Sequence, residues 1–177
     1  MLSRTTMIIC PYCASENIEG EDECAQCGQP LADVHIAPPA NEVERSLRQD
    51  RINVLSPKRP ITVTPTTPMR DVLNLMVERK IGCVIVAENN RPVGVFSERD
   101  ALLKLNTAAA ELSNRPVSEF MTPKPQTLDT DARLAFAVQR MDMGAYRHLP
   151  IVDARGELAG IISARDILRH LMESLAT

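Results

Sequence analysis

The chain has 177 residues, enough for one ordinary domain and a small module, and 44% of them are hydrophobic and 24% charged, as in soluble globular proteins. No stretch approaches the ~20 apolar residues that cross a bilayer, and the net charge of −3 argues against a nucleic-acid-binding protein. We therefore expect a cytoplasmic protein with no membrane segment. Thiols stay reduced there, so clustered cysteines are expected to be metal ligands or redox groups rather than disulfides.

Four cysteines near the N-terminus follow the pattern C-x2-C-x10-C-x2-C. The first pair, in CPYC, also matches the active-site tetrapeptide of glutaredoxin-like proteins. A redox site of that kind needs a strand before it and a long helix after it, whereas the next stretch, ASENIEGEDE, is polar and short. Two Cys-x-x-Cys turns instead close a tetrahedral site of four thiolates, so the sequence predicts zinc, with iron as the alternative. Residues 7–32 resemble a short zinc ribbon of the rubredoxin-like kind, whose metal ligands are Cys10, Cys13, Cys24 and Cys27.

Two roles are open for this ribbon. A segment so small has almost no core, so a metal would supply most of its folding free energy, and the ribbon would stabilise the chain or dock a protein partner. Many zinc ribbons bind nucleic acid, but residues 1–40 hold six acidic residues against one basic residue, Arg4, and this charge repels phosphates. The fifth cysteine, Cys83, lies in the apolar stretch IGCVIVA and is expected to be a buried small hydrophobe.

Residues 33–57 read as a linker. Pro38 and Pro39 break regular structure, and NEVERSLRQD predicts a short charged helix that begins at Asn41. A group of basic residues is expected to form a solvated face or, alternatively, to lie near an anionic ligand: Arg45, Arg48, Arg51, Lys58 and Arg59.

The rest of the chain contains an internal repeat. GVFSERD and GIISARD match, and their serines, Ser97 and Ser163, are 66 residues apart. The same offset, without a gap, places Val72 on Val138 and Gly94 on Gly160.

Each repeat has the pattern β-α-β-β-α. In the first, ITVTP is followed by a helix with Thr67 as N-cap, Pro68 as first residue and Gly82 as its end. CVIVA, the turn NNRP, VGVF and a helix from SERDALLKL follow. The apolar face of the first helix is predicted to hold Met69, Val72, Leu73, Met76 and Val77.

The second repeat runs through QTLDT, a helix over residues 132–141, the strands LPIVD and LAGII, and a last helix from SARDILRHLMESL. The pattern predicts an α/β (α+β) fold, with sheets packed on helices. Residues 55–174 resemble a tandem pair of cystathionine-β-synthase (CBS) domains, on the two Gly-x-x-Ser-x-x-Asp endings, the linker VSEFMTPKP and the strand RHLPIVD. The resemblance implies a pseudo-two-fold pair of repeats, over residues 58–115 and 116–177.

The Ser-x-x-Asp sequences have two interpretations. A serine followed three residues later by an acid, before an apolar helix, is a capping box. The same helix start also favours an anion, so that the serine donates to a phosphate and the carboxylate accepts from the ribose hydroxyls of a nucleotide. Arg99 and Arg165, inside the two motifs, would neutralise phosphate charge.

The CBS resemblance implies that adenosine ligands, AMP, ADP, ATP or S-adenosylmethionine, bind in a cleft between the repeats. The motif residues carried over are Ser97, Asp100, Ser163 and Asp166. The stretch before the middle strand is also implied to line the cleft: Tyr146, Arg147 and His148 in repeat two, and Lys80, Ile81 and Gly82 in repeat one. Repeat two offers more cationic side chains there, so we expect it to form the better site.

No catalytic motif is found, and the three histidines, His35, His148 and His170, are scattered. We therefore expect a non-catalytic regulatory module that binds an adenosine nucleotide. The alternatives are a ligand-free dimerisation scaffold and a nucleic-acid-binding regulator that acts through the ribbon. The resemblance also implies a homodimer. Helix faces that would form its contact, or equally the internal core, are those of Leu134, Val138 and Met141 and of Met69 and Met76.

Overall fold

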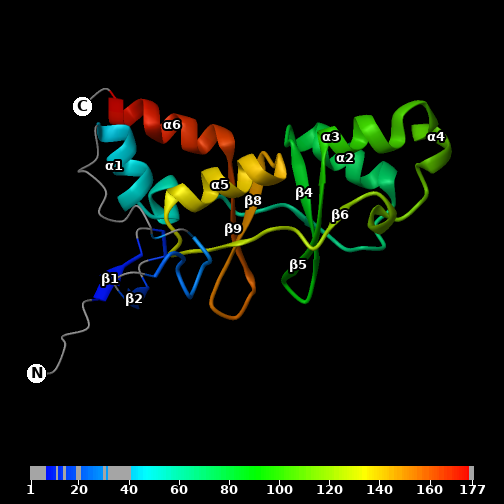
Figure 1. Cartoon of the computed structure of the whole chain (residues 1–177). Helices are drawn as coiled ribbons and strands as arrows, with labels where there is room; N and C mark the ends of the chain where they lie inside the picture. Colours follow the sequence, from blue (N-terminus) through cyan, green and yellow to red (C-terminus); the bar gives the residue numbers. More distant parts are fainter. Residues whose placement is uncertain are drawn as a thin grey trace, which may run out of the picture. The chain divides into compact units, whose positions relative to one another are not determined.

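The computed structural model describes residues 7–10, 12–13, 15–18, 21–29, 31 and 41–175. The prolines Pro38 and Pro39 and the histidine His35 lie outside the described residues. The chain divides into two compact units, each described by itself. The ribbon unit comprises Met1–Ser56, Asp131–Tyr146 and Ala164–Thr177, and the sheet unit comprises Pro57–Thr130 and Arg147–Ser163. Figure 1 gives the order of the elements along the chain.

The ribbon begins with an antiparallel hairpin. Strand β1 (Met7–Ile9) pairs with β2 (Glu16–Ile18), so that Met7 lies opposite Ile18. Its small core contains Cys10, Cys24 and Leu31. Two of these three residues are cysteines, which agrees with a module that depends on its metal centre rather than on apolar burial.

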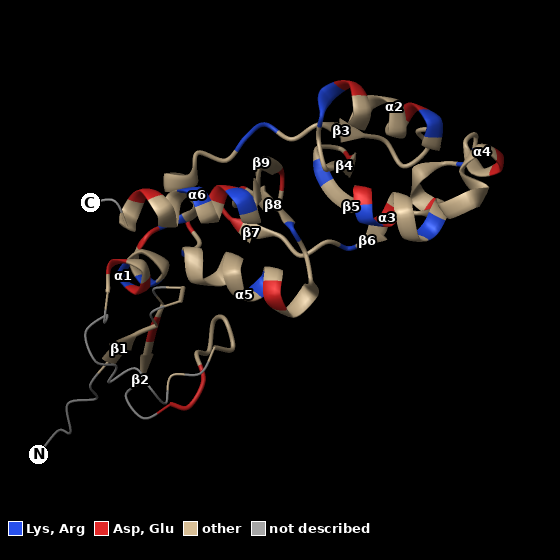
Figure 2. Ribbon diagram, turned by 90° about the horizontal axis from the view of Figure 1, so that it is seen from above, with Lys and Arg blue, Asp and Glu red and all other residues tan. Residues whose placement is uncertain are grey.

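Helix α1 (Glu42–Gln49) is the helix predicted in the linker. Its N-cap is Asn41, whose side chain accepts a hydrogen bond of 2.9 Å from the backbone N–H of Glu44. Arg45 and Arg48 form ion pairs with acidic residues of the same helix, and Figure 2 shows both charges along α1. At these two arginines the predicted solvated charged face is confirmed.

The linker helix is attached to the helices of repeat two, α5 (Leu134–Gly144) and α6 (Ala164–Leu175). Figures 1 and 2 both show α1 beside α6. The Ser46 hydroxyl donates to Asp50 at 2.6 Å and lies 3.0 Å from Nε2 of His170, which is itself 2.9 Å from the Asp50 carboxylate. A short 3-10 helix, Ile52–Leu55, then leads out of the linker.

The first sheet of the sheet unit belongs to repeat one. Its strand order is β3-β4-β5-β6, in which β3 and β4 are parallel and the other neighbours antiparallel. Helix α2 (Met69–Arg79) packs its Met69, Val72 and Met76 against Val84 and Phe96 of the sheet. The strands are β3 (Thr62–Val63), β4 (Cys83–Glu88), β5 (Arg91–Ser97) and β6 (Thr122–Pro123).

An irregular helical segment follows β5. It runs through α3 (Glu98–Asp100), a π-helical turn (Ala101–Leu105), a 3-10 turn (Asn106–Ala108) and α4 (Ala109–Leu112). A further 3-10 turn, Val117–Glu119, precedes β6. The second sheet, of repeat two, has the order β7-β8-β9, with β7 (Leu128–Asp129), β8 (His148–Val152) and β9 (Leu158–Ser163).

Each repeat receives a segment from the linker that precedes the other. Strand β6 comes before the sheet strands of repeat two but pairs with β5 of repeat one, where Pro123 lies opposite Gly94. Lys58 comes before the strands of repeat one but exchanges two backbone hydrogen bonds with Ile161 of β9, at 3.1 and 2.9 Å. Because both crossings lie inside the sheet unit, the two sheets belong to one compact unit.

The repeat offset of 66 does not hold throughout. Helix α5 aligns with α2 at an offset of 65, because Leu134, Ala137 and Met141 are buried where α2 buries Met69, Val72 and Met76. The predicted match of Val72, which is fully buried, to Val138, which is 39% exposed, is therefore wrong.

The one-residue difference between the helix offset of 65 and the motif offset of 66 arises in the β-hairpin that follows each helix. Repeat one turns on Asn89 and Asn90 alone, both in the left-handed region with φ of 48° and 61°, whereas residues 153–157 form the longer loop of repeat two. As a result Ile151 lies opposite Gly160, while Val86 lies opposite Gly94.

The ends of α2 also differ from the prediction. The N-cap is Pro68, because the Thr67 hydroxyl closes a turn by accepting from the N–H of Thr64 at 3.1 Å. The helix ends at Arg79, with Lys80 in the left-handed region before Gly82 is reached. Val77, predicted for the apolar face, is 77% exposed. Within the described residues, no helix is long and apolar enough to span a membrane.

Candidate functional site

The four predicted metal ligands come together. Their Sγ atoms all lie within 4.8 Å of one another, with 3.7 Å between Cys10 and Cys27 and 3.5 Å between Cys13 and Cys24. A tetrahedral metal with metal–sulfur bonds of about 2.3 Å separates its sulfurs by about 3.8 Å, so the arrangement fits a four-thiolate centre. All four are free thiols rather than disulfides.

Local hydrogen bonds shape this centre. The Tyr12 N–H donates to Sγ of Cys10 at 3.4 Å, and Gly28, at φ 68°, donates its N–H to the carbonyl of Cys24 at 2.8 Å. This left-handed backbone conformation favours glycine, which has no Cβ atom. Burial raises the pKa of Cys27, whereas for Cys24 hydrogen bonds from Ser15 and backbone amides outweigh burial and lower the pKa to about 6.

Asn17, which was not predicted as a site residue, connects the two halves of the ribbon. Its side chain is only 3% exposed, donates to the Ser15 carbonyl at 3.0 Å and accepts from the Ala25 N–H at 3.0 Å. In the sequence it is one polar residue in a polar stretch, so no pattern distinguishes it.

The ribbon packs on α5, the first helix of repeat two. The Tyr12 ring meets Phe136 edge to face, with centroids 5.9 Å apart, and the Gln29 side chain donates to Gln139 at 2.8 Å. The Arg140 guanidinium lies 6.0 Å from the Phe136 centroid, and burial lowers its pKa, an effect that the nearby Cys27 opposes. A four-thiolate centre with a divalent metal carries net negative charge, which this cation offsets.

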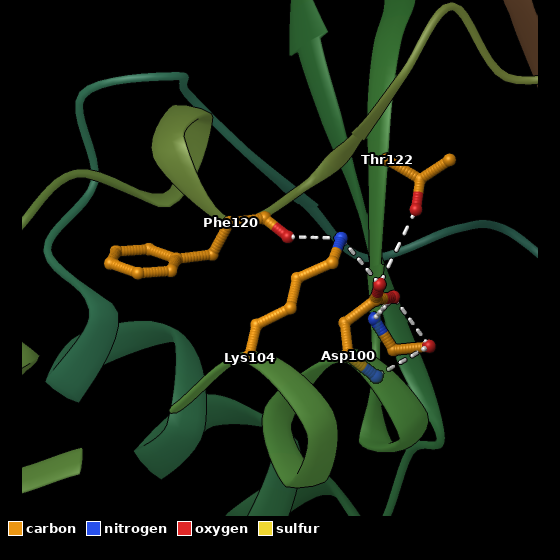
Figure 3. Close-up of polar contacts among 5 residues, drawn as sticks. Asp100, Lys104, Phe120 and Thr122 are labelled. Carbon is orange, nitrogen blue, oxygen red and sulfur yellow. Dashed lines mark hydrogen bonds and ion pairs between the residues drawn. The ribbon is translucent and has the colours of Figure 1, made fainter. Parts of the chain in front are cut away.

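In repeat one the Ser-x-x-Asp sequence forms the predicted capping box. Figure 3 shows Asp100 beneath the end of β5. Its Oδ2 accepts from the Ser97 N–H at 3.0 Å and from the Ser97 hydroxyl at 2.6 Å, and Oγ of Ser97 accepts from the Asp100 N–H at 3.3 Å.

The other oxygen of Asp100 is also occupied. Nζ of Lys104 lies 2.7 Å from Oδ1 and donates to the Phe120 carbonyl at 2.7 Å, and the Thr122 hydroxyl donates to Oδ1 at 3.3 Å (Figure 3). Burial raises the pKa of Asp100, but hydrogen bonds from Lys104 and Ser97 outweigh it and hold the pKa below its usual value. The carboxylate is therefore charged at neutral pH.

In repeat two the structure brings two predicted residues together. Ser163, the last residue of β9, lies opposite His148, the first residue of β8. Asp166 is 8% exposed and lies 3.6 Å from the Arg169 guanidinium, within α6. Arg147 and Arg165 are exposed.

Residues of both repeats converge at Gly82. A Cβ atom on Gly82 would lie 3.2 Å from Cε1 of His148 and 3.5 Å from a carboxylate oxygen of Glu98. The Glu98 N–H also donates to the Gly82 carbonyl at 3.0 Å. The structure thus places His148 and Gly82, two of the residues predicted for the cleft, near each other. Glu98 lies there too and was not predicted, because it occupies a variable position of the Ser-x-x-Asp motif.

Three more predicted residues are chain neighbours of this convergence, because Lys80 and Ile81 precede Gly82 and Arg99 follows Glu98. Lys80 is exposed and Ile81 half-buried at the end of α2, with the Ile81 N–H bonded to the Met76 carbonyl at 3.0 Å. Arg99 is exposed beside Asp100. Tyr146, in the ribbon unit, holds its ring against Gly144, where a Cβ atom would lie 1.9 Å from the ring. Cys83 is buried as predicted, and burial together with the charge of Glu98 raises its pKa to about 12.

Comparison with known proteins agrees with this architecture. The CBS domain family model matches residues 53–106 and 117–173. The chain is 32% identical over 139 residues to inosine-5'-monophosphate dehydrogenase from Aquifex aeolicus, a match that covers 74% of this chain and 26% of that enzyme.

Two solved structures of similar fold contain AMP. A CBS domain protein from Pyrobaculum aerophilum complexed with AMP has a TM-score of 0.60 and 27% identity, over 70% of this chain and 98% of the other. CBSX2 in complex with AMP has a TM-score of 0.57 and 29% identity, over 68% and 96%. The family model matches more than half of this chain, in two consecutive ranges of residues. This chain therefore belongs to the CBS domain family and carries two CBS domains in tandem.

Proposed function

We propose that this protein is a regulatory module that binds an adenosine nucleotide at the Ser-x-x-Asp helix starts and does not itself catalyse a reaction. AMP is the first candidate because the two similar structures above, at 27% and 29% identity, are AMP complexes. ADP, ATP and S-adenosylmethionine are the other ligands to test. In this proposal residues 7–32 form a metal ribbon and 33–57 a linker, followed by repeats over 58–115 and 116–177.

The convergence of Gly82, Glu98 and His148 is the observation that carries the proposal. It brings the start of a middle strand from each repeat, and the start of a motif helix, to one place in the sheet unit. In repeat two the motif serine lies opposite a histidine, so that a hydroxyl and an imidazole occupy facing positions on β9 and β8, and in this proposal both contact the phosphate. Arg147 and Arg165 would add charge, and Asp166 would accept from the ribose.

A sensor must also respond to its ligand. A nucleotide shifts the shape or the partner affinity of the module only if it binds the two states with different affinity. The matched region is 26% of the length of the dehydrogenase, so the activity of that enzyme is not carried over.

Isothermal titration of the metal-loaded chain with AMP, ADP, ATP and S-adenosylmethionine tests the proposal. We expect saturable binding of at least one ligand, loss of the repeat-two site and so weaker overall binding in Asp166→Ala, and full retention in Asp71→Ala, which removes an exposed carboxylate on α2. A correctly folded protein that releases no heat with any of the four would contradict the proposal and favour the ligand-free scaffold.

We also propose that the chain forms a homodimer through apolar helix residues. The predicted contact residues Leu134 and Met69 are fully buried, and Met76 and Met141 nearly so, and they form internal core instead. Exposed apolar residues remain on the described helices, among them Leu102 at 76%, Leu168 at 63% and Met172 at 65%. Sedimentation of Leu168→Glu and Met172→Glu variants tests this assembly: a dimer becomes a monomer, whereas an unchanged state excludes this face.

For the ribbon, we propose a zinc centre that stabilises the chain, with iron as the alternative metal. The packing of Tyr12 and Gln29 on α5 supports a stabilising role within the chain. A protein partner for the ribbon stays a proposal without an identified surface. The acidic N-terminal segment argues against nucleic acid.

A further inference from the structure

The Asp100 carboxylate already has a full set of donors from its own chain. An ionised carboxylate offers about four acceptor positions. Oδ2 uses two for the N–H and hydroxyl of Ser97, and Oδ1 uses two for Lys104 and Thr122 (Figure 3). A ribose diol that sought the same oxygens would first have to displace one of these donors.

Among the donors to the Asp100 carboxylate, Lys104 is the charged one, so it is the main competitor of a ribose hydroxyl for these oxygens. Its ammonium is held between the Asp100 carboxylate and the Phe120 carbonyl, at 2.7 Å from each. The pair is four residues apart along the helical segment after β5, and the Asp100 side chain is only 15% exposed, which limits screening by water.

Repeat two has a different side chain at the equivalent position. Counting 66 residues from Lys104 gives His170, a residue of α6. His170 is bonded to Asp50 and Ser46 of the linker region. The lysine–aspartate contact is thus a feature of repeat one.

We propose that Lys104 is a specificity-determining residue that occupies the ribose acceptor of repeat one as an internal ligand, so that this repeat binds an adenosine nucleotide more weakly than its motif alone would allow. This inference rests on the proposed function. It also predicts that removing the positive charge of Lys104 raises the affinity for the nucleotide. Removing a cation weakens binding of an anionic nucleotide by simple electrostatics, so a gain in affinity requires the release of the carboxylate.

The test uses Lys104→Met in an Asp166→Ala background, in which the repeat-one site is the one that remains. We expect the affinity for AMP to rise about fivefold over Asp166→Ala alone, the upper end for a partly exposed ion pair. The gain should be smaller for 2′-deoxy-AMP, which lacks one of the two hydroxyls. The control is Arg115→Met, which breaks another ion pair four residues apart, with Glu119 in the same unit, without touching the motif.

The experiment distinguishes failure of the inference about Lys104 from failure of the proposed function. If the wild-type chain binds AMP but Lys104→Met leaves affinity unchanged or weakens it, Lys104 is no competitor and the inference fails alone. If neither the wild-type chain nor any variant binds AMP, ADP, ATP or S-adenosylmethionine, both the proposed function and the inference about Lys104 are wrong. Should Asp166→Ala not fold, as judged by its thermal melt, the comparison of AMP with 2′-deoxy-AMP is made for Lys104→Met in the wild-type background, with the same expected difference.

Discussion

Tyr12 of the ribbon packs edge to face on Phe136 of α5, with ring centroids 5.9 Å apart and an angle of 72° between the rings. Such pairs contribute about 0.5–1.5 kcal/mol beyond the area they bury. The contact is positioned by the first Cys-x-x-Cys turn, because Tyr12 lies between Cys10 and Cys13, two of the proposed metal ligands. The metal centre and the first helix of repeat two are therefore mechanically connected within the ribbon unit.

Loss of the metal should loosen this contact. We expect Cys24→Ser to abolish stoichiometric zinc binding, measured by mass spectrometry under native conditions, and to increase hydrogen exchange in β1, β2 and α5, because structural zinc supplies the folding free energy of such modules. Cys83→Ala is the matched control, since this thiol lies in β4 outside the cluster. Equal exchange rates in α5 with and without metal would show that the ribbon does not brace the helix.

Acid should remove the contribution of Asp100. Its pKa is lowered in the folded state, so its stabilisation is fully present above the ordinary aspartate value of about 4 and is lost as pH falls through the folded-state pKa. We expect Asp100→Asn to lower the free energy of unfolding by ~1.5–3 kcal/mol at pH 7, as for hydrogen bonds to charged groups. Urea melts at pH 7 and at pH 3 measure this, and a difference of the same size at both would show that ionisation is not the cause.

A buried polar cluster helps to attach the linker helix α1 to α6. Ser46 is 7% exposed and shares the Asp50 carboxylate with His170 of α6. We expect Ser46→Val to destabilise the chain by ~1–3 kcal/mol, because the buried polar partners lose a hydrogen bond, and to raise hydrogen exchange across Glu42–Gln49. Ser118→Val, at an exposed position in the sheet unit, should do neither. Unchanged exchange in α1 would mean that other contacts, such as the Arg133 guanidinium that donates to the Gln49 carbonyl at 2.7 Å, attach the helix without this cluster.

The two repeat glycines should respond differently to alanine. At Gly160 a Cβ atom would lie 2.7 Å from Cβ of Pro57, which is rigid, whereas at Gly94 it would meet the flexible Met121 side chain, with Sδ at 2.2 Å. Overpacking costs about 1–3 kcal/mol where neighbours cannot move. We therefore expect Gly160→Ala to lower the melting temperature more than Gly94→Ala. The reverse order would show that the Pro57 segment moves more easily than the methionine.

Some features of the fold and site could be predicted because they depend on local chemistry. Cysteine spacing determines which sulfurs meet, since each Cys-x-x-Cys turn positions its own pair. The capping box at Ser97 and the cap at Asn41 follow from hydrogen bonds that span three residues. The repeated β-α-β-β-α pattern and the buried Cys83 follow from apolar periodicity.

The tertiary structure alone decided the relationships between distant segments. A hairpin loop longer in repeat two shifts the alignment of its helix by one residue, which a uniform offset conceals. Two contacts join residues far apart in the sequence: Tyr12 packs on Phe136, and His148 lies near Gly82. The burial of Leu134 likewise depends on the tertiary structure. The lysine that fills the acceptor of Asp100 reads in the sequence as an ordinary surface residue. Its role depends on the segment that places the Phe120 carbonyl beside Lys104 and the Thr122 hydroxyl beside Asp100. A contact between segments so far apart in the sequence leaves no local pattern.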